Sequence, residues 1–122
     1  MSEPSVFREN SVSYIRIPTT SPADSAAFYK DVFGWTIHHN SETPSFTDGS
    51  GHTIGHFVSD QAPVGPDGVR PYIYVDDLAA ALAAAQAAGA AIATPPYPEG
   101  NLTVATITDP SGNTVGIWTK AT

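Results

Sequence analysis

The strongest constraint on the fold is a ten-residue motif that occurs twice in the chain. Residues 48–57 read DGSGHTIGHF and residues 109–118 read DPSGNTVGIW, so both copies share the spaced Asp, Ser, Gly, Thr and Gly. Each copy starts with turn-forming residues and continues with β-branched and aromatic residues, which is typical of a turn followed by a strand. A motif repeated in this way predicts that the chain holds two copies of one structural unit.

The sequence before each copy of the motif predicts a strand and then a helix. Residues 13–17 and 70–75 have the residue types of strands. The first helix is predicted from Ser21-Pro22, a helix-start signal, to Gly34, which favours a helix end. The second is predicted over residues 78–88, with Asp76 or Asp77 as its N-cap and a glycine after it.

Three more strands are predicted after each helix, so that each half reads β-α-β-β-β. The chain is therefore expected to be one domain of α+β class, residues 1–122, with a tail over 1–11, modules over 12–60 and 69–122, and a linker over 61–68. The second half is longer, and we assign the extra residues to a proline-rich loop over 94–101. The expected strands are 35–39, 45–47 and 53–59 in the first half and 91–93, 102–108 and 114–119 in the second.

Composition excludes several classes of protein. Apolar residues make up 41% of the 122 residues, which is enough for a folded core, and no long apolar run predicts a membrane span. The net charge of −7 argues against binding to nucleic acid or to an anionic membrane. The absence of cysteine excludes disulfides and thiolate chemistry. The first residues lack the apolar stretch of a signal peptide, so we expect a cytoplasmic protein.

Three short segments resemble the vicinal oxygen chelate superfamily, which includes glyoxalase, bleomycin-resistance proteins and ring-cleaving dioxygenases. They are FYKDVFGW at 28–35, YVDDL at 74–78 and DPSGN at 109–113, and the resemblance extends over residues 12–118. It implies two βαβββ modules whose mixed sheets curl into a cup with the helices outside, often completed in a homodimer. Whether the modules pair within one chain or between two chains stays open.

The resemblance also implies where a metal would bind, and the residues there argue against one. Metal-dependent members carry a His, Glu or Gln on the first and last strand of each module, and these positions map to Tyr14, Gly55, Arg70 and Gly116. Such a set does not hold a divalent cation, so no cofactor is expected. His56 is the weak outside candidate for a metal ligand. Strand alternation turns it away from the cup if Gly55 faces inward.

Strand alternation predicts an aromatic lining for the cup, with two arginines and with room left by the glycines at the ligand positions. The remaining histidines are His38, His39 and His52. His38 and His39 are adjacent on a strand, so their rings would point to opposite faces. All three are expected to be surface or structural residues. The expected ligand-binding residues are Tyr14, Arg16, Phe57, Arg70, Tyr72, Tyr74 and Trp118.

The first functional hypothesis is a metal-free protein of the drug-resistance type that binds a small aromatic or amphipathic molecule. The alternative is a small-molecule enzyme in which Arg16 or Arg70 stabilises an enolate or oxyanion and Tyr14 or Tyr72 acts as the acid. A metal-dependent lyase or dioxygenase would require a strand register different from the one assumed above, so that other residues occupy the ligand positions. The acidic composition favours a cationic ligand, whereas inward arginines favour an anionic one. The arginines would serve neither role if they pair with acidic neighbours.

Overall fold

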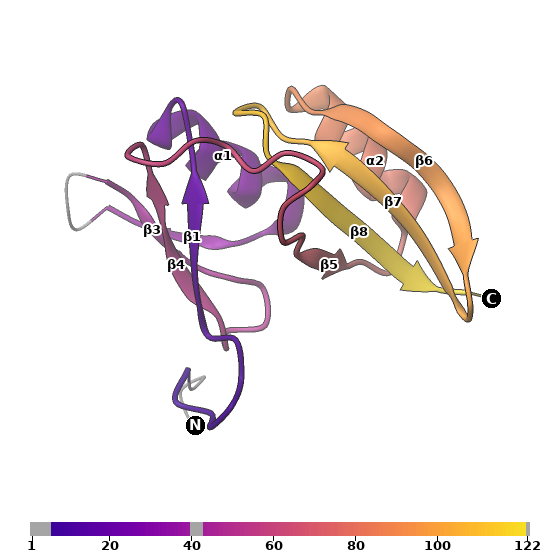
Figure 1. Ribbon diagram of the computed structural model, residues 1–122, viewed down its shortest axis with the longest axis horizontal. Helices are drawn as coiled ribbons and strands as arrows, with labels where there is room; N and C mark the ends of the chain where they lie inside the picture. The colour runs from indigo at the N-terminus through magenta and orange to yellow at the C-terminus, as the bar shows by residue number, and fades with distance from the viewer. Residues whose placement is uncertain (1–5, 40–42, 122) are drawn as a thin grey trace. The chain divides into compact units, whose positions relative to one another are not determined.

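The computed structural model describes residues 6–39 and 43–121, and it divides the chain into two compact units, residues 1–62 and 63–122 (Figure 1). Within the described residues, each unit contains one helix and one four-stranded mixed sheet. This confirms the α+β class and the β-α-β-β-β order of both halves. The curling of the sheets into a cup stays a prediction. Part of the expected tail, residues 1–5, lies outside the described residues.

Unit 1 has the strand order β1-β4-β3-β2, in which β1 and β4 are parallel and the other pairs are antiparallel. Helix α1 begins where predicted, because the Ser21 side chain accepts a hydrogen bond from the Asp24 amide, and it ends at Gly34 in the left-handed conformation (φ 71°). The elements are β1 (Tyr14–Pro18), α1 (Pro22–Phe33), β2 (Thr36–His38), β3 (Ser45–Thr47) and β4 (Ile54–Val58).

Unit 2 repeats this topology with the order β5-β8-β7-β6, and again the first pair is parallel. Asp77 is the N-cap of α2, since its carboxylate accepts a hydrogen bond from the Ala80 amide at 3.0 Å. The elements are β5 (Tyr72–Tyr74), α2 (Leu78–Ala87), β6 (Ala91–Glu99), β7 (Leu102–Thr108) and β8 (Thr114–Lys120).

The proline-rich segment that we predicted as a loop is part of a strand. Strand β6 continues through Pro95, Pro96 and Pro98 to Glu99, with two register shifts against β7. Strand β6 is an edge strand, so its outer side has no neighbouring strand, and a proline that lacks an amide proton there loses no hydrogen bond. The two register shifts accommodate prolines on the side that faces β7. The prediction of a short strand over 91–93 was therefore wrong, because proline does not end a strand that lies at the edge of a sheet.

The two units have different kinds of core. In unit 1, the rings of Tyr29, Trp35 and Phe46 stack in series at centroid distances of 4.7 Å, and Phe57 contacts both Tyr29 and Phe46. The core of unit 2 is aliphatic and holds Leu78, Leu82, Ala85, Ala105, Ile107, Val115 and Ile117. Aromatic side chains in unit 2 must therefore lie elsewhere.

The turns of the repeated motif differ by one residue, which changes how the following strands face. In unit 1 the Asp48 amide donates to the Thr53 carbonyl, whereas in unit 2 the Asp109 amide donates to the Asn113 carbonyl. The first turn is thus one residue longer, and β4 and β8 are offset by one position relative to the sequence repeat. Because side chains alternate along a strand, this offset reverses which residues of the motif face the core.

A candidate ligand-binding face

The sheet of unit 2 carries its aromatic residues on the face opposite the buried Ile117. Tyr72 pairs with Gly116 and Tyr74 pairs with Trp118 in the β5–β8 register, which places the three aromatic side chains on one face, as predicted. The two tyrosines remain 40% and 43% exposed, so this face is open within the unit. Tyr74 and Trp118 contact edge to face, with ring centroids 4.9 Å apart.

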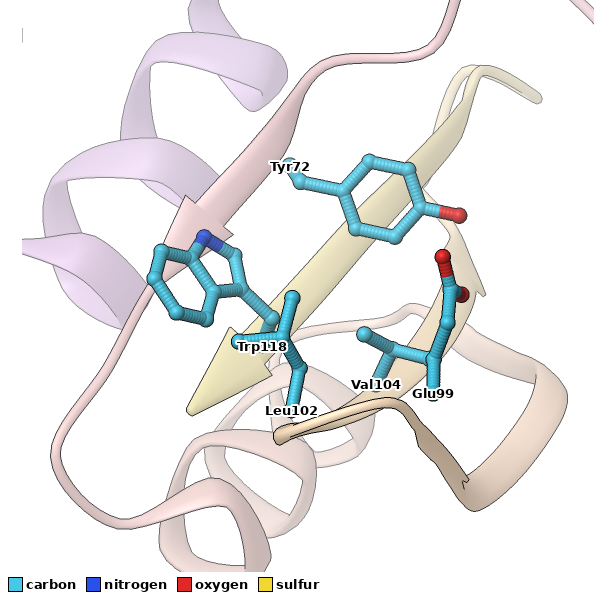
Figure 2. A pocket seen from close by; sticks show the side chains of 5 residues that line it. All are labelled: Tyr72, Glu99, Leu102, Val104 and Trp118. Atoms are coloured by element: carbon cyan, nitrogen blue, oxygen red, sulfur yellow. The ribbon is translucent and has the colours of Figure 1, made fainter. Parts of the chain in front are cut away.

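Five side chains on this face line a pocket of about 210 Å³ (Figure 2). In Figure 2 the Tyr72 ring lies above the pocket and the Trp118 indole to its left, and the carboxylate of Glu99 points towards the hydroxyl end of Tyr72. Pockets that enclose a drug-sized molecule measure ~300–1,000 Å³, so this one fits a single ring system. The lining residues are Tyr72, Glu99, Leu102, Val104 and Trp118.

Gly116 positions the Tyr72 ring on the sheet. A Cβ atom on Gly116 would collide with ring carbons of Tyr72, so only glycine allows the ring to lie over this strand. We expected the glycine to leave space for a ligand. That expectation was wrong, because the ring of its strand neighbour fills the space and becomes a wall of the pocket.

The guanidinium of Arg70 contacts the outer end of the Tyr72 ring and does not line the pocket. Its Nη1 donates to the Tyr72 hydroxyl at 3.3 Å, and its Nη2 donates to the Pro66 carbonyl at 2.7 Å. Its Nε is buried and has no hydrogen-bond partner among the described residues. Arg70 therefore orients Tyr72, and its charge is near one end of the pocket only.

Tyrosine hydroxyls next to carboxylates have altered acidity on this face. The Tyr74 hydroxyl donates to Asp76 at 2.9 Å, and this hydrogen bond is the main cause that raises the pKa of Tyr74 above its ordinary value. Burial raises the pKa of Tyr97, and the neighbouring Tyr72 and Glu99 raise it further. Both hydroxyls thus stay protonated and available as donors at neutral pH.

The corresponding face of unit 1 is polar. His56 lies on the same face as Tyr14, and its Nδ1 is 3.1 Å from the Tyr14 hydroxyl. Arg16 is on this face too, but its guanidinium is paired with Asp60 at 3.2 Å and with Gln61 at 3.0 Å. Of the adjacent histidines, His38 joins this face, since it pairs through β3 with His56, and its Nε2 is 2.9 Å from the Thr47 hydroxyl.

The expected positions of Phe57, Gly55 and His56 were wrong by one residue. Phe57 is fully buried against Tyr29 and faces the helix, so it does not line an open face. Gly55 also faces the core, where an added Cβ would collide with the Phe46 ring and the backbone of β1. His56 takes the outward position that we had given to Gly55. The cause is the longer turn before β4, which the sequence repeat does not reveal.

With the longer turn before β4, the four metal-ligand positions implied by the resemblance become Tyr14, His56, Arg70 and Gly116. Only His56 among them is an ordinary metal ligand. A single imidazole beside a phenol does not fit a divalent cation, and neither an arginine nor a glycine supplies a ligand. Over residues 6–39 and 43–121, no three His, Asp or Glu side chains gather closely enough to hold a metal ion. The residues therefore do not fit the metal centre of metal-dependent members.

Sequence reasoning missed Glu99, Leu102 and Val104 as pocket residues. Glu99 lay in the segment predicted as a loop, and the alternation of Tyr97, Pro98 and Glu99 was the one signal that pointed to a strand. Leu102 and Val104 lie in the strand expected over 102–108, for which no inward-facing residues were predicted from the sequence.

Comparison with known proteins identifies the family. The sequence profile of the Glyoxalase/Bleomycin resistance protein/Dioxygenase superfamily matches residues 11–117. The chain belongs to this superfamily. Curated proteins of Mycobacterium bovis and Mycobacterium tuberculosis, both named "Putative glyoxylase CFP32", are 27% identical over 97% of this chain. The chain spans about half the length of these curated relatives, 49%.

Solved structures of other superfamily proteins show the same fold. A glyoxalase/bleomycin resistance protein/dioxygenase family enzyme from Burkholderia phytofirmans aligns with a TM-score of 0.74 at 22% identity, covering 88% of this chain and 97% of its own. TnmS3, an antibiotic binding protein from Streptomyces sp. CB03234, aligns with a TM-score of 0.72 at 19% identity, covering 92% and 97%. No helix of the described residues is long and apolar enough to cross a membrane.

Proposed function

We propose that this superfamily member binds a small, flat aromatic molecule on the open face of the β5–β8 sheet and does so without a metal. The observation that carries the proposal is the pocket between Tyr72 and Trp118, because aromatic walls provide stacking and apolar contact for a planar ring. The antibiotic-binding protein TnmS3 supports it, since it combines the same fold with a small-molecule ligand. The pocket size suits a ligand with one ring system.

A binding screen with two matched variants tests this proposal. Flat aromatic compounds are titrated while Trp fluorescence is recorded, and Trp118→Ala is compared with Tyr14→Ala, which removes an aromatic side chain from unit 1. We expect Trp118→Ala to weaken binding at least about tenfold and Tyr14→Ala to leave it unchanged. Hits whose affinity is equal in both variants would contradict the site.

Elemental analysis tests the metal-free part of the proposal. We expect less than about 0.1 metal ion per purified chain and no thermal stabilisation by divalent cations. Close to one metal per chain, lost in His56→Ala, would contradict this and favour a metal-dependent lyase or dioxygenase.

An enzyme that uses Tyr14 as an acid is the second candidate, and the hydrogen bond to His56 favours it. The imidazole is placed to exchange a proton with the phenol at 3.1 Å. Arg16 is less suited to hold an anionic group than expected, because its guanidinium is paired with Asp60 at 3.2 Å. Turnover that is lost in Tyr14→Phe and His56→Gln but kept in Trp118→Ala would support this candidate. The homodimer also stays a prediction, and light scattering of the purified protein tests it.

A further inference from the structure

Glu99 is the one charged side chain among the residues that line the pocket of unit 2. It makes no ion pair with any of the described residues, and its sole hydrogen bond is a long one, accepted from the Tyr97 hydroxyl at 3.5 Å. In Figure 2 its carboxylate points to the same side of the pocket as the Tyr72 hydroxyl. A carboxylate without an ion-pair partner among the described residues thus lines the same pocket as two aromatic rings.

This combination of groups attracts organic cations. Aromatic faces carry negative potential and attract an ammonium or guanidinium, and a neighbouring carboxylate adds direct charge attraction. The same carboxylate repels an anionic ligand. The net charge of −7 acts in the same direction at longer range.

Arg70 is the nearby charge that opposes this preference. Its two terminal nitrogens are engaged by the Pro66 carbonyl and the Tyr72 hydroxyl, and the side chain is absent from the pocket lining. A ligand in the pocket therefore contacts the carboxylate directly, whereas the guanidinium lies at the hydroxyl end of Tyr72 and is not part of the pocket lining.

We infer that the pocket selects aromatic molecules that carry a cationic nitrogen, with the ring against Trp118 and Tyr72 and the nitrogen at Glu99. This inference rests on the proposed function and names its ligand class. It also assigns to Glu99 the role of the specificity-determining residue.

Three probes of equal shape test the inference: naphthylmethylamine, naphthylmethanol and naphthoate. Their affinities are measured by Trp fluorescence and by calorimetry for the full chain. We expect the amine to bind about tenfold more tightly than the alcohol, and the naphthoate to bind most weakly. Glu99→Gln should make the amine and the alcohol equal. Asp67→Asn, which removes the same charge at an exposed position of unit 2, should leave the order unchanged.

The outcomes separate this inference from the proposed function. If the alcohol binds as tightly as the amine, or if Glu99→Gln leaves the preference intact, the inference is wrong and aromatic binding stands. If none of the three probes binds, both are wrong. A preference that Asp67→Asn removes as effectively as Glu99→Gln would show that net charge, and not the pocket, selects the ligand.

Discussion

The two units share a topology but distribute their aromatic residues in opposite ways. Unit 1 buries Phe57 in an aromatic core and exposes a polar face with Tyr14 and His56. Unit 2 has an aliphatic core and exposes Tyr72 and Tyr74, with the half-buried Trp118 on the same face. Phe57 and Trp118 occupy the same position of the sequence motif, yet they lie on opposite faces of their sheets. One residue in a turn is enough to move a position of the motif from the core to the opposite face of the sheet.

The largest test of this contrast compares the two aromatic residues directly. Phe57→Ala should lower the free energy of unfolding by about 3–5 kcal/mol, because it opens a cavity beside Tyr29 and Phe46. Trp118→Ala should cost clearly less stability while it weakens aromatic ligands. Urea denaturation of both variants measures the difference. Equal losses of stability would show that Trp118 is also a core residue.

The glycines of the motif should differ in the same way. Gly55→Ala places a methyl group against the backbone of β1 and the Phe46 ring, and we expect a loss of about 2–3 kcal/mol. The nearest atoms to the new methyl group of Gly116→Ala belong to the Tyr72 ring, which is partly exposed and can turn outward. It should therefore reduce stability less and ligand affinity more. Thermal unfolding and probe titration of each variant distinguish the two effects, and a Gly116→Ala variant with intact binding would contradict the wall formed by Tyr72.

The aspartates that close the two turns provide a smaller test. Asp109 is buried and accepts hydrogen bonds from the amides of Ser111 and Asn113 and from the Asn113 side chain. Asp109→Ala should cost about 1–3 kcal/mol, because it leaves buried donors unpaired.

Asp48→Ala is the matched change in the longer turn of unit 1. Asp48 accepts from Ser50 and Gly51 in more accessible surroundings, so the loss should be about 1 kcal/mol or less. Denaturation midpoints of Asp109→Ala and Asp48→Ala measure the two losses of stability. A larger loss for Asp48→Ala would contradict the expectation that the turn of unit 2 contributes more to stability.

The smallest expected effect concerns Tyr97 at the edge of the pocket. Its raised pKa means that the folded protein disfavours the phenolate, so this contribution to stability is complete below the ordinary pKa of 10.0 and is lost as the pH rises through the folded value. Glu99→Gln removes one cause and should lower this pKa. The tyrosinate absorbance of wild-type protein and Glu99→Gln follows the change, with Tyr97→Phe to assign the signal. An unchanged pKa would indicate that burial and Tyr72 set it without Glu99.

Much of the fold follows from local features of the sequence. Ser21 and Gly34 mark the ends of α1, Asp77 marks the start of α2, and the repeated motif marks the final strand of each unit. The aromatic face of unit 2 was also predictable, because Tyr72 and Tyr74 alternate along β5 and Trp118 pairs with β5 in register. Caps, turns and alternation are short-range properties, so they can be recognised without knowing what packs where.

Other features were decided only by tertiary structure. The outward position of His56 depends on how many residues close the preceding turn, and that number is set by hydrogen bonding between strands rather than by residue type. The strand character of residues 94–99 depends on β6 lying at a sheet edge, where proline is tolerated. The pocket joins Glu99 and Tyr72 from opposite edges of one sheet, and the sequence separation between them conceals this proximity. Local residue patterns therefore identify the order of the elements, whereas strand pairing decides which side chains share a face, because a shift of one residue reverses every side chain of a strand.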